Sequence, residues 1–205
     1  MLRIDRHKIY ESHGYTFINF VCLTDEEKQM VLDWRNHERV RCMMLNKDVI
    51  SLENHLAFIE SLNTRDDCFY WLVKDPTGCN VGVLDVIHVD YEKDQGEIGY
   101  YINQDELGKG FQFMIECQYF VYQQLQLGNN NVTINIKNKE ILLFKKYLGS
   151  TFEGIETIGD ESFYFNHHAN GKYIIEYYDT FNLADFARFV KNNKNKDINF
   201  DIITE

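Results

Sequence analysis

The sequence predicts an α+β fold whose elements follow one another in the order β-αα-βββ-α-β-α-ββ. Three observations support this prediction: stretches in which apolar and polar residues alternate, capped stretches with apolar residues every three or four positions, and a glycine-bearing loop between a strand and a central helix. The 205 residues, 44% of them hydrophobic, can bury one good core. We therefore expect one main domain, residues 1–180, followed by a C-terminal helix and polar tail, residues 181–205.

The strands are predicted from apolar and polar alternation and from the turn residues between them. They are expected to span residues 15–22, 69–74, 81–89, 97–102 and 132–136, with a final hairpin in the aromatic-rich run up to about residue 178. Pro76-Thr77-Gly78 is expected to turn the first hairpin and Asn170-Gly171 the last.

The helices are predicted from N-caps and apolar spacing. Thr24 precedes three acidic residues and should cap the first helix, and Ser51 should cap the second. The predicted helices span residues 25–37, 52–62, 113–125, 138–148 and 181–190. Beyond residue 190 the chain is polar, and we expect a loose tail.

Charge and cysteine content restrict the partners and the compartment. A net charge of -11 disfavours a nucleic-acid polymer or an anionic membrane, so any anionic ligand must be held by local positive groups. The cysteines are odd in number and scattered, which predicts reduced, mostly buried residues in the cytoplasm and no metal site: Cys22, Cys42, Cys68, Cys79 and Cys117. We see no secretion signal and no stretch of membrane-spanning length.

The glycine-bearing loop lies within residues 95–113, QGEIGYYINQDELGKGFQF. Gly108 and Gly110 precede the apolar run of the central helix, where bare backbone N–H groups and the helix dipole can hold a pyrophosphate. Two such glycines can equally serve only to turn the chain, and this alternative stays open on the motif alone.

The element order and this loop together resemble the GNAT superfamily of acetyl-CoA-dependent N-acetyltransferases. The superfamily signature is Q/R-x-x-G-x-G/A, and residues 105–110 keep both glycines but have Asp105 at the first position. The resemblance implies a three-layer α+β (α/β) fold, in which helices flank a mixed central sheet whose strands splay at the cofactor site.

Within the superfamily the chain is most similar to the UDP-4-amino-4,6-dideoxy-β-L-AltNAc N-acetyltransferases of the pseudaminic acid pathway. The motifs that carry this likeness, which covers about residues 15–154, are Trp34-Arg35-Asn36-His37, Met44, ISLENHL at residues 50–56 with Phe58-Ile59, and Gly82-Val83. The likeness implies a cytoplasmic enzyme that acetylates the amine of a nucleotide-linked amino sugar in nonulosonic acid or surface-polysaccharide biosynthesis.

The resemblance also implies where acetyl-CoA binds. Its pantetheine arm would lie where the strand 97–102 splays from the strand 132–136, pairing with backbone groups as a strand does. The residues expected to contact the cofactor are Tyr100, Tyr101, Ile102, Leu107, Gly108, Lys109, Gly110, Phe111 and Asn138. Asn138 can also serve as a helix N-cap, and both roles are compatible.

The nucleotide part of the substrate would be held by Arg35 and His55, with Met44 and Tyr101 as walls of the pocket. Arg35 belongs to a positive cluster that includes Arg39, Arg41 and Lys47. These charges could instead complement the dipole of the first helix. His37 could bind substrate or cap a helix.

Glu97 is the first candidate for the base that takes the proton of the amine, because many family members place a glutamate on this strand. Asp85 is the second candidate, although it could also accept structural hydrogen bonds, whereas His88 is expected on the opposite strand face. The family usually has a tyrosine as general acid seven residues after the asparagine, and here that position is Lys145. Tyr147 lies about 200° around the helix from this direction. The thiolate of CoA can be protonated by water, and Lys145 could also serve as the acid.

Two rival interpretations remain at this point. The chain could be a GNAT enzyme that acetylates another amine, such as a polyamine, an antibiotic or a protein N-terminus. It could also be a catalytically silent acetyl-CoA-binding module, as Asp105 and the missing tyrosine suggest. A homodimer is possible in each case.

Overall fold

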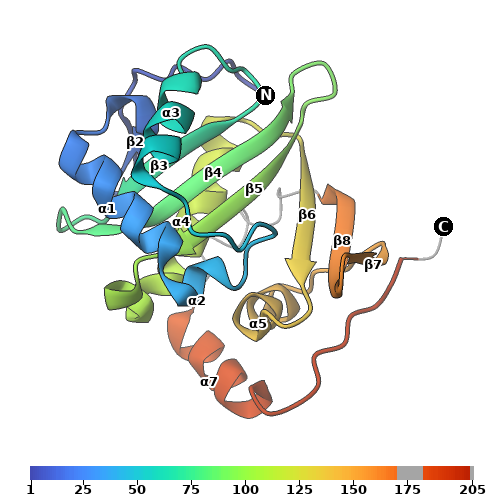
Figure 1. The fold of residues 1–205 in the computed structure, drawn as a ribbon. Helices are drawn as coiled ribbons and strands as arrows, with labels where there is room; N and C mark the ends of the chain where they lie inside the picture. Colours follow the sequence, from blue (N-terminus) through green and yellow to red (C-terminus); the bar gives the residue numbers. More distant parts are fainter. Residues whose placement is uncertain (170–181, 204–205) are drawn as a thin grey trace. The chain divides into compact units, whose positions relative to one another are not determined.

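The computed structural model describes residues 1–169 and 182–203 and contains two compact units, Met1–Gly128 and Asn129–Glu205 (Figure 1). The predicted boundary between residues 180 and 181 lies outside the described residues.

The first unit is built on an antiparallel sheet. Its strands, in spatial order, are β1 (Tyr10–Ser12), β2 (Tyr15–Asn19), β3 (Phe69–Lys74), β4 (Asn80–Asp90) and β5 (Gln95–Ile102). Alternation along these strands gives the sheet two apolar faces, with Leu72 on one and Trp71 on the other, both fully buried. The sheet therefore needs a helical layer on each side.

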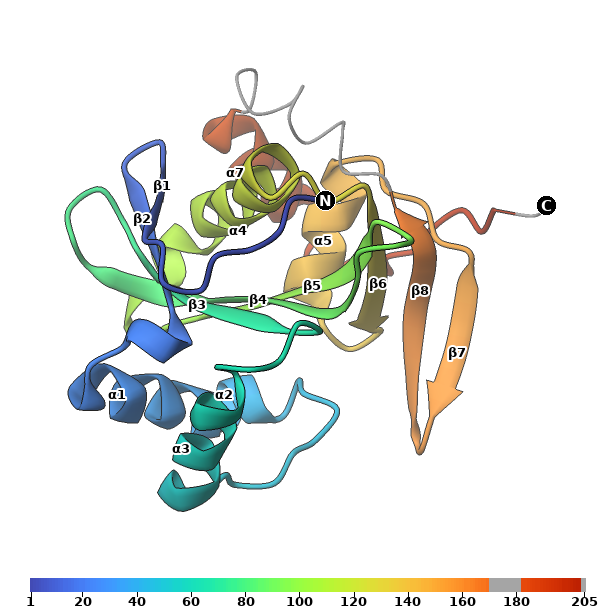
Figure 2. The same ribbon diagram turned by 90° about the horizontal axis from the view of Figure 1, so that it is seen from above.

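Three helices lie along one face of the first unit's sheet: α1 (Asp25–Asn36), α2 (Glu38–Arg41) and α3 (Leu52–Ser61) (Figure 2). Thr24 and Glu27 form a capping box at the start of α1, and Ser51 accepts the Asn54 N–H at the start of α3, so both predicted caps are confirmed. Apolar side chains of these helices and of the sheet form one core cluster, which includes Val31, Trp34, Ile59, Leu72 and Val83.

The opposite face carries the central helix. A 3₁₀ segment, η2 (Gln104–Lys109), leads into α4 (Gly110–Tyr119), which continues as a π-helical turn, η3 (Phe120–Gln124). The Phe120 ring stacks on Phe17 with centroids 4.0 Å apart and meets Trp71 edge-on at 5.6 Å. These contacts fix α4 against the sheet, so that its first turn follows directly from the end of β5.

The second unit contains β6 (Asn129–Asn135), α5 (Lys139–Tyr147), β7 (Gly154–Ile158), β8 (Glu161–Ala169) and α7 (Leu183–Asn193). β8 pairs antiparallel with both β6 and β7. Its core cluster joins Val132, Ile134, Leu142, Phe152, Tyr164 and Phe200.

Several elements differ from the predicted ones. β1 and α2 were not predicted, and residues 20–22 form a 3₁₀ turn, η1 (Phe20–Cys22), because the Asn19 side chain accepts the Val21 N–H and ends the strand. The β7–β8 hairpin turns at Gly159-Asp160, where Gly159 has φ +60°. The predicted turn at Asn170-Gly171 lies outside the described residues.

The C-terminal segment is not loose where it is described. Phe200 is 9% exposed and its ring lies 4.7 Å from that of Phe152, while Ile202 forms a bridge with Phe152. A second expectation also fails, since three of the five unpaired cysteines, Cys22, Cys42 and Cys79, are exposed. None of the helices in the described part of the chain combines the length and apolar character needed to cross a membrane.

Candidate active site

The glycines of the η2–α4 junction leave the start of the central helix open. Neither has a positive φ, and a Cβ at Gly108 would meet no atom of the described residues within 4 Å. A Cβ at Gly110 would meet only the Ile102 Cδ1, at 3.4 Å. The N-cap residue Lys109 makes no side-chain capping bond within the described chain. Glycine is thus required here neither by the fold nor by internal packing, which fits a site where a phosphate approaches the backbone.

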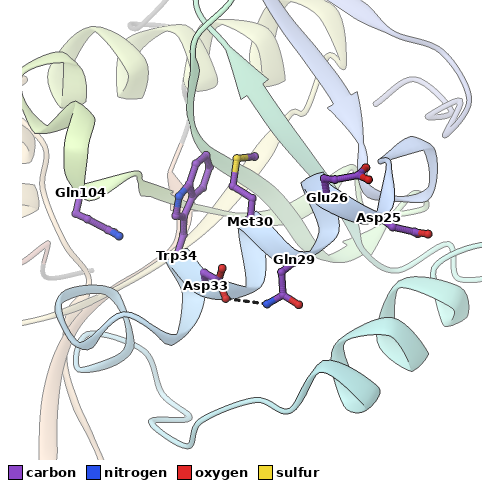
Figure 3. A pocket seen from close by; sticks show the side chains of 7 residues that line it. All are labelled: Asp25, Glu26, Gln29, Met30, Asp33, Trp34 and Gln104. Carbon is purple, nitrogen blue, oxygen red and sulfur yellow. Dashed lines mark hydrogen bonds between the residues drawn. The ribbon is translucent and has the colours of Figure 1, made fainter.

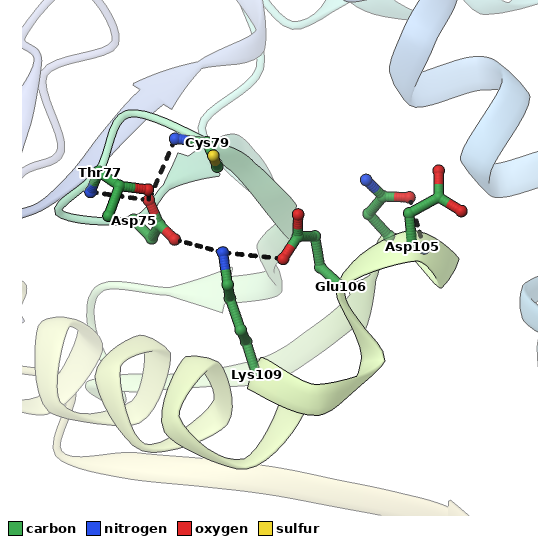
Figure 4. A network of polar contacts seen from close by, with 7 residues as sticks. Asp75, Thr77, Cys79, Asp105, Glu106 and Lys109 are labelled. Carbon is green, nitrogen blue, oxygen red and sulfur yellow. Dashed lines mark hydrogen bonds and ion pairs between the residues drawn. The ribbon is translucent and has the colours of Figure 1, made fainter.

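Lys109 does not point into this opening. Its Nζ lies 2.7 Å from Asp75 Oδ2 and 2.8 Å from Glu106 Oε2 (Figure 4). Burial would raise the pKa of Asp75, but bonds from Lys109, Thr77 and Cys79 hold that pKa well below its usual value. The pair ties η2 to the β3–β4 turn, so Lys109 serves to position the glycine loop. Its predicted contact with acetyl-CoA stays a prediction.

The other predicted residues of this loop differ in exposure. Leu107 is 40% exposed and Phe111 is buried. Asp105, which replaces the residue of the family signature, is exposed, and its backbone N–H is bonded to the Asn103 side chain. Contacts of Leu107 and Phe111 with the cofactor through backbone atoms do not depend on the exposure of the side chain, and these contacts stay predictions.

Asp85 is a half-buried carboxylate on the sheet face that α1 and α3 cover. It pairs across β4–β5 with Gly99, and a Cβ at residue 99 would stand only 2.5 Å from Asp85 Oδ1. Burial, and then the neighbouring Glu97 carboxylate, raise the pKa of Asp85 to about 7. A carboxylate that exchanges its proton near neutral pH is suited to general base catalysis.

Glu97 lies on the same face of the sheet as Asp85. Its partner across the sheet is Ile87, two residues from Asp85 along β4, so the two candidate bases are diagonal neighbours. The Glu97 side chain is 24% exposed, and its Oε2 lies 3.2 Å from His88 Nδ1. The sheet thus brings both predicted bases together, and it adds His88, which was expected on the opposite face. That expectation is wrong because a bulge redirects the residue.

Arg35 is half-buried near the same sheet face. Its Nη2 donates to the Asn46 carbonyl at 2.8 Å, while its Nη1 is buried without a hydrogen-bond partner among the described residues. Burial lowers the pKa of Arg35, and the nearby phenols of Tyr101 and Tyr70 oppose that shift. Burial, and then Asp85, raise the pKa of both phenols. Arg35, Tyr101 and Asp85 therefore belong to one neighbourhood, and Tyr70 is a member that the sequence did not indicate.

The loop after α2 is held over this neighbourhood by the motif residues. Asn36 donates its Nδ2 to the Ile50 carbonyl and accepts the Ile50 N–H, both at 2.8 Å. Arg41 Nη1 donates to the Lys47 carbonyl at 2.6 Å. This paired contact of Asn36 with Ile50 explains why the two parts of the motif occur together, a role that the sequence alone did not reveal. Met44, within this loop, is half-buried.

The two predicted histidines bond to backbone groups of α1 and α2. His55 is 6% exposed and its Nε2 lies 3.1 Å from the Lys28 carbonyl, about two turns of α1 before Arg35. Burial lowers the pKa of His55, which favours the neutral ring. His37 Nδ1 accepts the Arg39 N–H, so its expected alternative as a cap is observed. The substrate contacts of both residues remain predictions.

The second unit holds two further predicted site residues, Asn138 and Lys145. Asn138 caps α5 by accepting the Ile141 N–H at 3.4 Å. Lys145 is 6% exposed on α5. The ring of Tyr147 packs against α7, with centroids 5.1 Å from Phe186 and 5.4 Å from Phe189. The helix therefore directs Lys145 and Tyr147 to different surroundings, as their spacing predicted, and their chemical roles stay predictions.

A cavity of about 600 Å³ lies beside α1 in the first unit (Figure 3). It is lined by Asp25, Glu26, Gln29, Met30, Asp33, Trp34 and Gln104. Three carboxylates and an indole ring suit a cationic ligand rather than an anionic diphosphate. Arg35, Asp85 and Glu97 do not line this cavity, so we place the chemistry at the sheet face, where Asp85 has a raised pKa and Glu97 is paired with His88.

Comparison with known proteins agrees with this geometry. The family model for the acetyltransferase (GNAT) domain matches residues 18–140, more than half of the chain. A protein from Campylobacter jejuni subsp. jejuni named acetyltransferase PseH is 28% identical over 149 residues, 73% of this chain and 88% of its own length. The same protein from another strain is 29% identical over 109 residues, 53% of this chain and 67% of its own. These relatives confirm the predicted resemblance.

Solved structures share the fold. Campylobacter jejuni N-acetyltransferase PseH in complex with acetyl coenzyme A superposes with a TM-score of 0.57 at 19% identity, covering 76% of this chain and 99% of that one. Vibrio cholerae spermidine N-acetyltransferase in complex with CoA and spermine gives 0.63 at 12% identity, covering 78% and 99%. The predicted fold, enzyme class and co-substrate are confirmed at the level of the family. The chain therefore belongs to the GNAT family and is an acetyl-CoA-dependent N-acetyltransferase.

Proposed function

We propose that the chain transfers the acetyl group of acetyl-CoA to the amine of a UDP-linked 4-amino-4,6-dideoxy sugar, in nonulosonic acid (pseudaminic acid) or surface-polysaccharide biosynthesis. The observation that carries this proposal is the buried, unpaired Nη1 of Arg35 in the neighbourhood of Asp85. A guanidinium N–H without a protein partner among the described residues requires an acceptor, and a phosphate oxygen is a strong one. The likeness to PseH over 73% of the chain supports the same substrate class.

Different residues of the first unit bind acetyl-CoA, bind the sugar nucleotide and remove the proton. Backbone N–H groups at the start of α4 hold the pyrophosphate of acetyl-CoA, and Arg35 holds the diphosphate of the sugar nucleotide. Asp85 or Glu97 takes a proton from the ammonium group, so that the neutral amine attacks the carbonyl carbon of the thioester. A C–N bond forms, the C–S bond breaks, and the thiolate takes up a proton.

The test is release of free CoA thiol with a panel of amines. The panel contains UDP-4-amino-4,6-dideoxy sugars of different stereochemistry, the same sugars without UDP, and spermidine. We expect turnover with at least one UDP-linked sugar and a much higher KM for the same sugar without its nucleotide, because the contact of Arg35 is then lost. Equal kcat/KM values with and without UDP would contradict the proposal.

A polyamine is the second candidate substrate, and the acidic cavity beside α1 favours it. Asp25, Glu26 and Asp33 attract a polycation and would repel a nucleotide diphosphate. Preference for spermidine in the same panel, and its loss in Asp33→Asn, would select this candidate. Binding of acetyl-CoA without turnover on any amine would instead identify a silent acetyl-CoA-binding module.

A further inference from the structure

His88 adopts a backbone conformation that a regular strand would not give it. Its φ is +51°, in the left-handed region that is costly for residues other than glycine. The register of β4 against β5 shifts between Ile87 and Asp90, so His88 lies in an irregularity of the strand. Bulges of this kind turn a side chain away from the face that alternation would assign to it. The imidazole consequently reaches Glu97 instead of the face opposite Asp85.

The three groups form a series from the interior to solvent. Asp85 is half-buried against Gly99, the Glu97 side chain is 24% exposed, and the His88 side chain is 70% exposed. Asp85 and Glu97 are diagonal neighbours across β4–β5, about 7–8 Å apart at their Cα atoms. His88 Nδ1 lies 3.2 Å from Glu97 Oε2. His88 is therefore the most exposed of the three groups and lies within hydrogen-bond distance of Glu97.

We propose that His88 is a positioning residue for Glu97 and carries to solvent the proton that Glu97 removes from the amine. The inference rests on the proposed function in that an amine is the acceptor and that Glu97, of the two candidate bases, takes its proton. The ammonium group gives one proton to Glu97 Oε2, which passes it to His88 Nδ1. The resulting imidazolium releases a proton to water, and proton exchange with water returns the ring to the tautomer with a free Nδ1. The attacking amine then loses its second proton, and the departing thiolate takes one up, so each acetyl transfer releases one proton.

The surroundings of His88 contain both signs of charge. Next to His88 on β4, the Val89 N–H donates to the Asp67 carbonyl at 2.9 Å. The Asp67 carboxylate in turn forms an ion pair with Arg65 at 2.6 Å. The other charged and titratable groups on β4, on β5 and on the segment leading into β3 are Arg65, Asp66, Asp67, Cys68, Asp85, Asp90, Glu97, Tyr100 and Tyr101. Glu97 is the group among them that bonds to the imidazole.

The experiment compares His88→Asn with His13→Asn. Asparagine tolerates a positive φ better than most residues, so both variants should fold. His13 is a matched control, because its φ is +48° and its Nδ1 also lies 3.2 Å from a glutamate oxygen, Glu116 Oε2, on α4. We expect His88→Asn to lower kcat about 10- to 100-fold, less than loss of a base itself, with unchanged KM values and melting temperature. His13→Asn should keep kcat.

A second variant separates proton transfer from a structural effect. In His88→Gly the positive φ at this residue carries no steric cost. Because the variant lacks only the imidazole, added imidazole should restore a large part of kcat. A wild-type kcat in His88→Asn would overturn the proposal, as would a loss in His88→Gly that imidazole does not restore. The assay uses whichever amine the wild-type enzyme acetylates. Failure with UDP-sugars but turnover of another amine would therefore reject the proposed substrate and still test His88.

Discussion

Asp85 and Gly99 are paired across the sheet so closely that residue 99 can carry no side chain without moving the carboxylate. A Cβ at Gly99 would lie 2.5 Å from Oδ1 and 2.8 Å from Oδ2 of Asp85. Glycine in the middle of a strand weakens it, so this position costs stability unless close approach is needed. The glycine therefore makes room for an acid that the sheet could not otherwise hold.

The ionisation of Asp85 should make the stability of the fold depend on pH. Its pKa is raised from 3.8 to about 7 by burial and by Glu97. Between these two values the folded state binds a proton that the unfolded state has released. The contribution of the protonated Asp85 to the free energy of unfolding is therefore full below pH 3.8 and is lost as pH rises to about 7. Asp85→Asn should then be more stable than the wild type at about pH 8, by up to about 4 kcal/mol, and should show little difference at about pH 4.

Urea unfolding at several pH values measures this difference. Glu97→Gln is a useful control, because it leaves burial as the remaining cause and should shrink the pH dependence without abolishing it. If Asp85→Asn and the wild type lose stability in parallel across this range, Asp85 does not titrate there, and Glu97 alone remains a candidate for the base.

The contribution of Arg35 to substrate binding can be separated from its contribution to loop structure. Arg35 and Arg41 both donate to carbonyls of the same loop, at Asn46 and Lys47. Arg35→Ala should weaken binding of a UDP-amino sugar by about 1.5–3 kcal/mol and leave acetyl-CoA affinity unchanged, because a charge-assisted hydrogen bond is lost. Arg41→Ala should have little effect on either. Equal losses in both variants, measured as KM and Kd, would show that the two arginines act only by ordering the loop.

The caps and strands near the chemistry could be predicted because their signals are local. Thr24 and Ser51 act within three residues of themselves, and the β3 strand ends where its turn residues begin. His88 could not be placed correctly, because strict alternation assumes a regular register and a bulge leaves no clear mark in the sequence.

The site itself depends on contacts between distant residues. Arg35 and Tyr101 lie on different elements, and only the family resemblance suggested that they share a pocket. Tyr70 gave no signal, since an aromatic residue in a strand is equally typical of a core. The contact of Asn36 with Ile50 crosses 14 residues and follows no periodicity. His55 was predicted to bind substrate, yet helix packing places its ring in a buried contact with α1.

The two glycines at the η2–α4 junction should be dispensable for folding and necessary for cofactor binding. A Cβ at Gly108 meets open space among the described residues, and Gly110 has helical φ and ψ. Gly110→Ala should keep or slightly raise the melting temperature, since alanine favours a helix by about 1 kcal/mol. Gly110→Val should abolish the thermal stabilisation that acetyl-CoA gives the wild type, because its branched side chain blocks the backbone N–H groups. If acetyl-CoA stabilises Gly110→Val as much as the wild type, the pyrophosphate binds elsewhere.

Tyr147 should contribute to stability rather than to proton transfer. Its ring contacts Phe186 and Phe189 of α7, and the spacing from Asn138 directs it away from the position of the family's acid. Tyr147→Phe keeps the ring and should keep kcat. Tyr147→Ala should lower the free energy of unfolding, by about 0.5–1.5 kcal/mol for each aromatic pair beyond the buried area lost. Phe189→Ala is the matched control for one of these pairs, and its stability loss should be smaller. A collapse of kcat in Tyr147→Phe with both substrates still bound would contradict this assignment, and would show that the phenol, rather than Lys145, protonates the departing thiolate.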